Sequence, residues 1–216
     1  MKPAFELVFF DVDSTLVTIE GIDVLAAGDP EIARLTEAAM EGLVALDEVY
    51  GLRLERIRPT REDVDALARR YLESMVPGAE ETIAALRNAQ VEIHLVTAGI
   101  RQAVLPLAAR LGIGPRAVHA VELEFGPDGS YAGFDSRSPL ARSGGKQTVV
   151  LDVRARSHGR AAFVGDGATD LEARDAVDRF IGFGGVRRRE RVAREAHAYV
   201  DDPSLTAVIP LLESRS

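Results

Sequence analysis

The sequence of 216 residues has a formal net charge of −8, and 46% of its residues are hydrophobic while 28% are charged. This composition supports a sizeable buried core and excludes a disordered chain, and no apolar run approaches the roughly 20 residues of a membrane-spanning helix. The acidic balance disfavours nucleic-acid binding, and the absence of cysteine excludes disulfides and a cysteine nucleophile and makes a cytoplasmic protein the expectation.

The chain begins with an apolar segment at 5–10, whose aromatic and β-branched residues predict a strand buried on both faces of a parallel sheet. The polar residues 11–15 follow directly, at the end of the strand where open α/β sheets bind ligands. Between residues 20 and 74, apolar residues recur at helical spacing without a convincing strand, and Thr60 with Asp63 predicts a helix start. Since this stretch is too long for a normal crossover, it predicts a helical insertion.

After residue 77, helices and strands alternate, which predicts βαβ units and a largely parallel sheet. The expected helices cover 79–88, 100–111, a segment after 145, a segment from 168, and 205–212, and the expected strands cover 91–96, 118–125, 130–134, 161–164 and 179–182. The turn sequence at 126–129 predicts a hairpin between two of these strands. We therefore expect an α/β fold: a three-layer, Rossmann-like core with a mostly parallel sheet (residues 1–15 and 76–216) and a small helical cap domain (residues 16–75).

Polar side chains cluster where predicted strands end or a helix begins, and such positions can converge at one edge of a sheet. They are Asp11 and Asp13, Thr97, Lys146, and Asp166 and Asp170. Carboxylate oxygens without other ligand types favour Mg²⁺, while a lysine and a hydroxyl beside them suit a phosphoryl group. Each cluster alone is typical of a turn or a helix cap, but four at equivalent positions point to phosphoryl chemistry.

The lysine count supports this interpretation. Two of the 26 basic residues are lysines, Lys2 and Lys146, and the other 24 are arginines. An interior lysine in such a chain predicts a site that needs a compact ammonium rather than a guanidinium. The arginines between residues 187 and 194 are interleaved with acids, which predicts a solvated helix face.

These motifs resemble the four ordered motifs of the haloacid-dehalogenase-like phosphatases. The matching segments are 10–16, the strand end at Thr97, 143–146 and 165–170. Within that superfamily the chain most resembles the phosphoserine phosphatases, a likeness that rests on 20–23, 39–42, Arg53, 131–135 and 182–185. The resemblance covers nearly the whole chain, and the helical insertion falls where that family carries its small cap domain.

The resemblance implies hydrolysis of O-phosphoserine to serine and phosphate through an aspartyl-phosphate, the last step of serine biosynthesis. It implies that Asp11 attacks the phosphorus, and that Asp13 protonates the serine oxygen and then deprotonates the hydrolytic water. It further implies that Asp11, the Asp13 carbonyl and Asp166 hold Mg²⁺, with Asp170 supporting the metal through water or an outer contact.

The resemblance also implies how the substrate is bound. Glu20 meets the substrate ammonium, Arg53 its carboxylate, and Met40 lines an apolar wall. The residues assigned to the phosphoryl group and its surroundings are Thr97, Ala98, Gly99, Lys146 and Thr169. Leu46 stands where the family usually carries phenylalanine, which predicts an altered wall of the serine pocket.

The expected partner is a small-molecule phosphate ester, with neither nucleic acid nor a membrane, and the sequence gives no oligomeric state. One alternative stays open: a phosphatase or phosphotransferase of the same fold acting on another small phosphate ester. A signalling receiver domain also combines acids, a threonine and a lysine around a phosphorylated aspartate. Its acidic pair precedes that aspartate, however, whereas here the proposed nucleophile Asp11 comes first.

Overall fold

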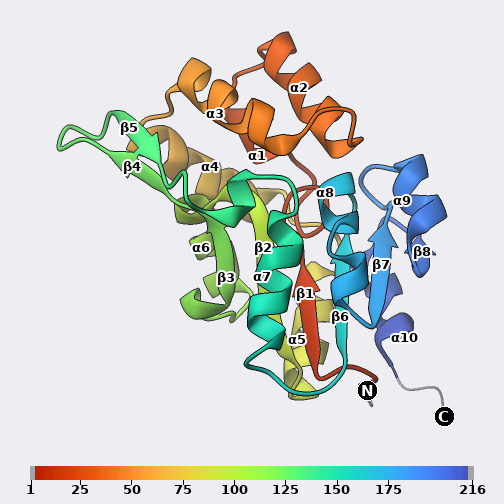
Figure 1. Cartoon of the computed structure of the whole chain (residues 1–216). Helices are drawn as coiled ribbons and strands as arrows, with labels where there is room; N and C mark the ends of the chain where they lie inside the picture. Colours follow the sequence, from red (N-terminus) through yellow and green to blue (C-terminus); the bar gives the residue numbers. More distant parts are fainter. Residues whose placement is uncertain (1–2, 214–216) are drawn as a thin grey trace.

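A parallel β-sheet forms the centre of the protein in the computed structural model, which describes residues 3–213 (Figure 1). Its strands are β1 (Leu7–Phe10), β2 (Glu92–Ile100), β3 (Val118–Val121), β6 (Ala161–Gly165), β7 (Arg179–Phe183) and β8 (Ala198–Val200). They lie in the order β3-β2-β1-β6-β7-β8, and every neighbouring pair is parallel. β1 is buried along its whole length, as its apolar sequence predicts.

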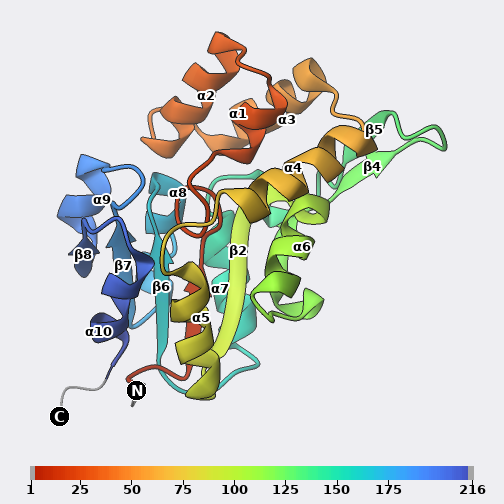
Figure 2. The same ribbon diagram turned by 180° about the vertical axis from the view of Figure 1, so that it is seen from behind.

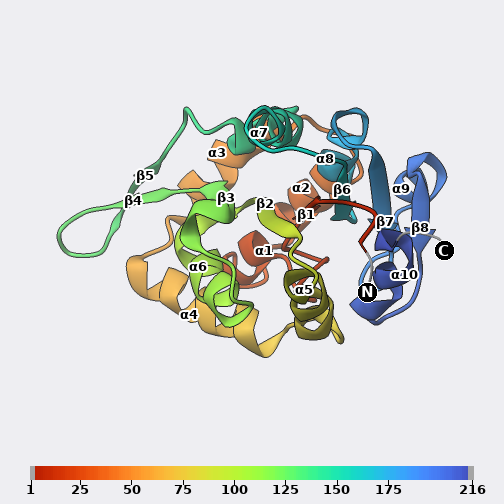
Figure 3. The same cartoon turned by 90° about the horizontal axis from the view of Figure 1, so that it is seen from below.

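Helices cover both faces of the sheet and give the three layers that the alternating pattern predicts (Figure 3). α5 (Ala79–Asn88) and α6 (Arg101–Arg110) lie on one face, and α7 (Gly145–Arg154) lies on the other. The remaining core helices are α8 (Ala168–Leu171), α9 (Glu190–Glu195) and α10 (Ile209–Leu212), with short 3-10 turns at Pro115–Ala117, Pro139–Ala141, Arg174–Ala176 and Leu205–Val208. In the part of the chain that the structure describes, no helix has the length and apolar character needed to cross a membrane.

The cap lies over the carboxyl edge of the sheet (Figure 2). Its helices are α1 (Gly21–Leu25), α2 (Pro30–Met40), α3 (Leu46–Ile57) and α4 (Arg61–Glu73). The predicted start of α4 is confirmed, because the Thr60 side chain accepts a hydrogen bond from Asp63 N and the Asp63 side chain accepts one from Thr60 N. The helical cap and the α/β core together confirm the predicted fold class.

The two connections between core and cap lie side by side. Thr18 N donates a 2.8 Å hydrogen bond to Ser74 O, and Val76 N donates a 2.9 Å bond to Leu16 O. A β-bridge joins Val17 and Met75 between them. This pairing supports our proposed division of the chain into a core (residues 1–15 and 76–216) and a cap (residues 16–75).

The predicted single strand over 118–125 is wrong, because it forms two strands. β3 ends at Val121, and β4 (Leu123–Phe125) pairs antiparallel with β5 (Tyr131–Phe134) in a hairpin that projects from the core (Figure 1). The Gln102 side chain donates a 2.7 Å hydrogen bond to Leu123 O and accepts a 3.2 Å bond from Leu123 N. These bonds occupy the backbone groups that would otherwise extend the main sheet.

Candidate active site

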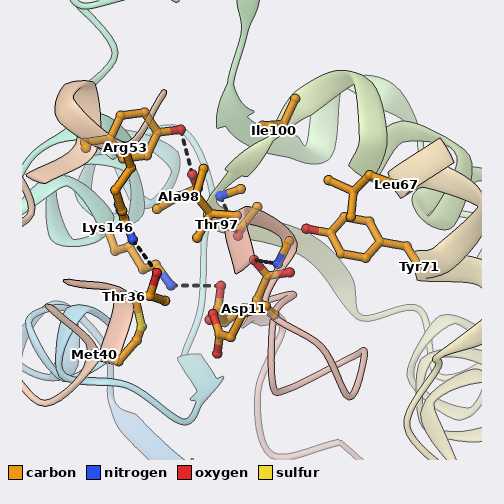
Figure 4. Close-up of a pocket in the computed structure, with 16 residues that line it drawn as sticks. Asp11, Thr36, Met40, Arg53, Leu67, Tyr71, Thr97, Ala98, Ile100 and Lys146 are labelled. Carbon is orange, nitrogen blue, oxygen red and sulfur yellow. Dashed lines mark hydrogen bonds and ion pairs between the residues drawn. The ribbon is translucent and has the colours of Figure 1, made fainter. Parts of the chain in front are cut away.

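Side chains from several strand ends meet beneath the cap (Figure 4). Asp11 follows β1 directly, Asp170 lies in α8, and Lys146 projects from the first turn of α7. Lys146 Nζ lies 2.8 Å from Asp11 Oδ1 and 2.5 Å from Asp170 Oδ1, and all three side chains are buried. The sheet therefore brings together residues that are far apart in the sequence.

Lys146 carries a buried charge shared between two carboxylates. Burial alone disfavours the ammonium, but Asp11 and Asp170 outweigh burial and raise the pKa of Lys146. Gly165 permits this arrangement, because a Cβ at that position would lie only 2.4 Å from Asp170 Cγ. The lysine is therefore an interior cation that stays protonated beside Asp11.

Asp11, Asp166 and Asp170 form a buried carboxylate group, with one candidate ligand oxygen from each lying within 4.8 Å of the others. Thr15 donates a 3.3 Å hydrogen bond to Asp166 Oδ1, which orients that carboxylate. Burial, together with the charge of Asp11, raises the pKa of Asp170 to about 7 despite the opposing effect of Lys146. Buried oxygen ligands that repel one another fit a divalent cation, because the cation removes the repulsion.

The environment of Asp13 favours a protonated carboxylic acid. Its Oδ2 accepts a 3.2 Å hydrogen bond from Gly21 N. Burial and the nearby charges of Glu20 and Asp11 raise the pKa of Asp13 well above its ordinary value, and an interaction with the Tyr71 hydroxyl opposes that rise. An acid beside Asp11 suits proton transfer to a leaving oxygen. The Asp13 side chain does not join the carboxylate group, so its backbone carbonyl is the metal contact that we propose.

Near its end, next to Asp11 and Lys146, β2 is irregular: its pairing with β3 shifts in register between Val96 and Ile100. We call the segment between these residues, 97–99, the phosphoryl-binding loop. Thr97 is buried, and its Oγ1 accepts a 3.0 Å hydrogen bond from Gly99 N. Thr97, Ala98 and Gly99 border the same cavity as Asp11 and Lys146. The loop therefore lies where a phosphoryl group held by the lysine would meet it.

This cavity has a volume of about 40 Å³ and lies between the core and the cap. The cap contributes Glu20, Met40 and Arg53 to its lining. The structure thus brings the three substrate-binding residues predicted in the cap to the same cavity as Asp11, Asp13 and Lys146. A cavity this small, enclosed between core and cap, excludes a polymer as its ligand.

Glu20 and Arg53 are both buried and face the cavity without forming an ion pair with each other in the described residues. Ser14 Oγ donates a 2.6 Å hydrogen bond to Glu20, and burial raises the pKa of Glu20. Arg53 Nη1 donates a 3.1 Å bond to Thr36 Oγ1, which in turn donates a 2.7 Å bond to Asp23. Arg53 Nε is buried and has no hydrogen-bond partner within residues 3–213. A free donor and a nearby acid fit the two charged ends of an amino acid.

Thr169 and Leu46, both expected at the substrate pocket, lie beside this cavity. Thr169 is buried and lines a neighbouring cavity together with Leu46 and Ser143. Leu46 N donates a 3.0 Å hydrogen bond to Ser143 Oγ, which anchors the start of α3 at this second cavity. Leu46 borders this second cavity, and the expectation that it alters the wall of the substrate pocket stays a prediction. A role of Thr169 in substrate binding stays a prediction.

The prediction of a solvated face for the arginines at 187–194 is wrong for Arg189, which is 2% exposed. Its Nε lies 3.2 Å from Asp166 Oδ2, and its Nη1 lies 3.0 Å from Glu37 on α2 and 3.0 Å from Glu41, which directly follows that helix. Arg188, the residue before it, is exposed and pairs with Glu190. Arg189 thus connects a candidate metal ligand to the cap.

Sequence reasoning also missed Tyr50 on α3 and Tyr71 on α4, which both line the cavity. Their helical spacing indicates burial, but it does not tell whether a ring faces the protein core or a cavity. Thr36 was missed for the same reason, because it occupies an apolar position of α2. Only the packing of the cap onto the core separates these possibilities.

A family model of the haloacid dehalogenase-like hydrolases matches residues 8–174. A phosphoserine phosphatase of Bos taurus is 38% identical over 201 residues, which cover 91% of this chain and 89% of that protein. A chloroplastic phosphoserine phosphatase of Arabidopsis thaliana is 40% identical over 197 residues, which cover 88% of this chain and 67% of that protein.

Solved structures share the fold. A phosphoserine phosphohydrolase-like protein from Francisella tularensis superposes with a TM-score of 0.86 at 23% identity, covering 98% of this chain and all of that one. A substrate-bound phosphoserine phosphatase complex gives 0.83 at 23% identity and covers 99% of each chain. The matched segment, 8–174, contains the nucleophile candidate, the cap and the acidic cluster. The chain belongs to the haloacid dehalogenase-like hydrolases and, within them, to the family of the phosphoserine phosphatases.

Proposed function

We propose that the protein hydrolyses O-phosphoserine to serine and inorganic phosphate through an aspartyl-phosphate intermediate. One observation carries the proposal: a single cavity between core and cap is lined by Asp11, Asp13 and Lys146 and also by Glu20 and Arg53, whose opposite charges do not pair with each other in the described residues. An amino acid esterified with phosphate carries a phosphoryl group for the first set, and an ammonium and a carboxylate for the second. The names of the relatives described above support the same substrate.

The reaction proceeds in two steps. In the first, Asp11 attacks the phosphorus and the bond from phosphorus to the serine oxygen breaks, while Asp13 gives its proton to that oxygen. In the second, water attacks the phosphorus and gives a proton to Asp13, and the bond to Asp11 breaks. Lys146 and Thr97 hold the phosphoryl oxygens, where negative charge gathers in both transition states. The raised pKa of Asp13 supports its role as the acid.

The proposed metal is Mg²⁺, bound by Asp11, Asp166 and the Asp13 carbonyl, with Asp170 in support. Phosphatases of this family generally use a metal ion, and the buried carboxylate group offers the hard oxygen ligands that Mg²⁺ prefers. When bound, the metal neutralises charge on the carboxylates and on the phosphoryl oxygens. Asp170 also holds Lys146, so it links the two sources of positive charge.

The cap residues read the amino-acid part of the substrate. Arg53 offers its guanidinium to the substrate carboxylate, and Glu20 accepts a hydrogen bond from the ammonium. Met40 supplies apolar contact beside them. Binding energy from these remote groups holds the ester in line with Asp11.

The test is phosphate release from O-phosphoserine, O-phosphothreonine, other small phosphorylated metabolites and p-nitrophenyl phosphate, with Mg²⁺ and with a chelator. We expect the highest kcat/KM for O-phosphoserine and loss of activity with the chelator. Equal kcat/KM for esters that lack an amino-acid part would contradict the substrate assignment. Acceptor alcohols in the same panel separate hydrolysis from phosphoryl transfer, the alternative that the sequence leaves open. A cytoplasmic location stays a prediction, and one relative is chloroplastic.

A further inference from the structure

Tyr50 lies where the cap, Arg53 and the phosphoryl-binding loop meet. It is on α3, one helical turn after Leu46, and it is 5% exposed. Tyr50 lines the active-site cavity, whereas Leu46 lines the neighbouring one. The mechanism described above assigns no task to Tyr50.

The hydroxyl of Tyr50 joins the cap to the core at the active site. Tyr50 Oη donates a 2.8 Å hydrogen bond to Ala98 O, in the loop whose Gly99 N binds Thr97 Oγ1. The edge of the ring packs against Phe134 of β5, with 5.3 Å between ring centroids and 60° between planes. Two separate parts of the core therefore fix the position of this one cap side chain.

The ring of Tyr50 also limits the positions open to Arg53. Arg53 Cζ lies 5.8 Å from the centroid of the Tyr50 ring, within the range of a cation–π contact. Thr36 holds Nη1 of the same guanidinium. With these two contacts in place, the Arg53 side chain stays at the border of the cavity, where a substrate carboxylate would bind.

We propose that Tyr50 is a positioning residue that anchors the docked cap to the phosphoryl-binding loop and thereby presents Arg53 to the carboxylate of the substrate. The proposal rests on the function proposed above and adds a determinant of selectivity. A phosphate ester without a carboxylate has nothing for Arg53 to bind. Replacing Tyr50 should therefore weaken the hydrolysis of O-phosphoserine and have little effect on that of an aryl phosphate.

The test compares Tyr50→Phe, which removes only the hydroxyl, with Tyr50→Leu, which also removes the ring. For Tyr50→Phe we expect KM for O-phosphoserine to rise about tenfold with kcat nearly unchanged, because a buried carbonyl loses its partner and the cap its anchor. For p-nitrophenyl phosphate the change should stay within about threefold, because the loop keeps its Gly99–Thr97 bond. Tyr50→Leu should lower kcat/KM for O-phosphoserine by about a hundredfold.

Tyr131→Phe is the matched control. Tyr131 is a buried tyrosine of the hairpin, its hydroxyl has no hydrogen-bond partner in the described residues, and it does not line the cavity. Removing this hydroxyl should leave KM and kcat unchanged for both esters. Melting temperatures within a few degrees of the wild type show that each variant is folded.

A double-mutant cycle shows whether Tyr50 acts through Arg53. In an Arg53→Ala background, Tyr50→Phe should cause little further loss on O-phosphoserine. Additive losses, or equal losses on both esters in the single variant, would overturn the proposal, because they indicate general support of the fold.

The wild-type enzyme decides the proposed function separately. If it does not prefer O-phosphoserine to p-nitrophenyl phosphate, the substrate assignment fails. The same cycle, run with the best ester of the panel, then still decides the role of Tyr50: coupling to Arg53 supports it, and additivity refutes it.

Discussion

Lys146 occupies an interior position because a compact ammonium fits between two carboxylates, 2.8 Å from Asp11 and 2.5 Å from Asp170. The sequence predicts this unusual role, because arginine supplies almost every other cation of the chain. It also predicts that Asp11 and Asp13 lie at the active site, because they directly follow a strand whose apolar residues place it in the core. Site residues at the end of such a strand can therefore be predicted from the sequence.

Lys146→Arg should lower kcat/KM by about 10²–10³, the loss typical of one electrostatic contact to a transition state. The planar guanidinium is too broad to contact both carboxylates and a phosphoryl group in the same space. Steady-state kinetics with O-phosphoserine give the loss, and a melting curve shows whether the variant folds. Near-wild-type activity would mean that Lys146 does not bind the phosphoryl group.

Asp11→Asn should abolish phosphate release while the protein stays folded. The amide keeps the shape of the side chain but is not a nucleophile, and its neutrality relieves repulsion with Asp166 and Asp170. Lys146 retains Asp170 as a partner. Stopped assays that follow phosphate for hours measure the residual rate. A comparable rate in the variant would exclude Asp11 as the nucleophile.

Arg53→Ala should lower kcat/KM for O-phosphoserine by about a hundredfold, since a charge-assisted bond to the carboxylate is worth roughly 2–3 kcal/mol. An aryl phosphate should be nearly unaffected. Measuring both esters on both enzymes separates recognition from folding. Equal losses would show that Arg53 supports the cap instead of binding the substrate.

At the scale of elements, Arg189 holds α2 of the cap against the end of β6. Its guanidinium lies near Asp166, Glu37, Glu41 and Glu20. Burial lowers its pKa, but Asp166, Glu37 and Glu20 outweigh burial and raise it. The sequence does not distinguish it from its neighbours, because adjacent arginines look alike until the cap is placed. The same limit applies to Tyr50: the sequence does not tell that its ring faces the cavity, because this depends on how α3 packs against the core.

Arg189→Met should lower the free energy of unfolding by about 2–3 kcal/mol, because it leaves Asp166 buried without this counter-charge while the two glutamates are partly wet. It should also reduce kcat/KM more than tenfold through weaker docking of the cap. Arg188→Met is the control, since Arg188 is exposed and pairs only at the surface. Urea unfolding measures both variants. Similar curves for the two would refute the role of Arg189 in joining cap and core.

The hairpin of β4 and β5 marks another limit of sequence-based prediction. The turn at 126–129 is predicted correctly, because its glycines and proline indicate a tight connection. The break at residue 122 is not, because it depends on Gln102 of α6 binding both backbone groups of Leu123. Local turn chemistry is visible in a sequence, whereas a long-range side-chain contact that ends a strand is not.

At the scale of the whole molecule, the cluster of buried acids ties stability to pH and metal. The pKa values of Asp13, Asp166 and Asp170 are all raised, first by burial, and that of Asp170 reaches about 7. These three carboxyl groups therefore bind more protons in the folded protein than in the unfolded chain above a pH of about 4, so their contribution to metal-free stability falls as pH rises from 5 to 7. Burial lowers the pKa of His119 to about 4 and also lowers that of His197, and these two groups act in the opposite direction.

Mg²⁺ should reverse this trend. Because binding needs ionised carboxylates, the rise in melting temperature on adding Mg²⁺ should be larger at pH 7.5 than at pH 5. Calorimetry of the chelated and the Mg²⁺-loaded protein at both pH values measures the four melting temperatures. An equal rise at both pH values would show that Mg²⁺ does not bind at the acid cluster.

The paired connections at residues 16–18 and 74–76 also bear on how such proteins diversify. Because the chain leaves and re-enters the core at adjacent points, the sheet order does not depend on what lies between them. An ancestor could have exchanged one lid for another of different length without moving a strand. Substrate range could then evolve in the inserted segment, while the residues that transfer the phosphoryl group were inherited unchanged in the core.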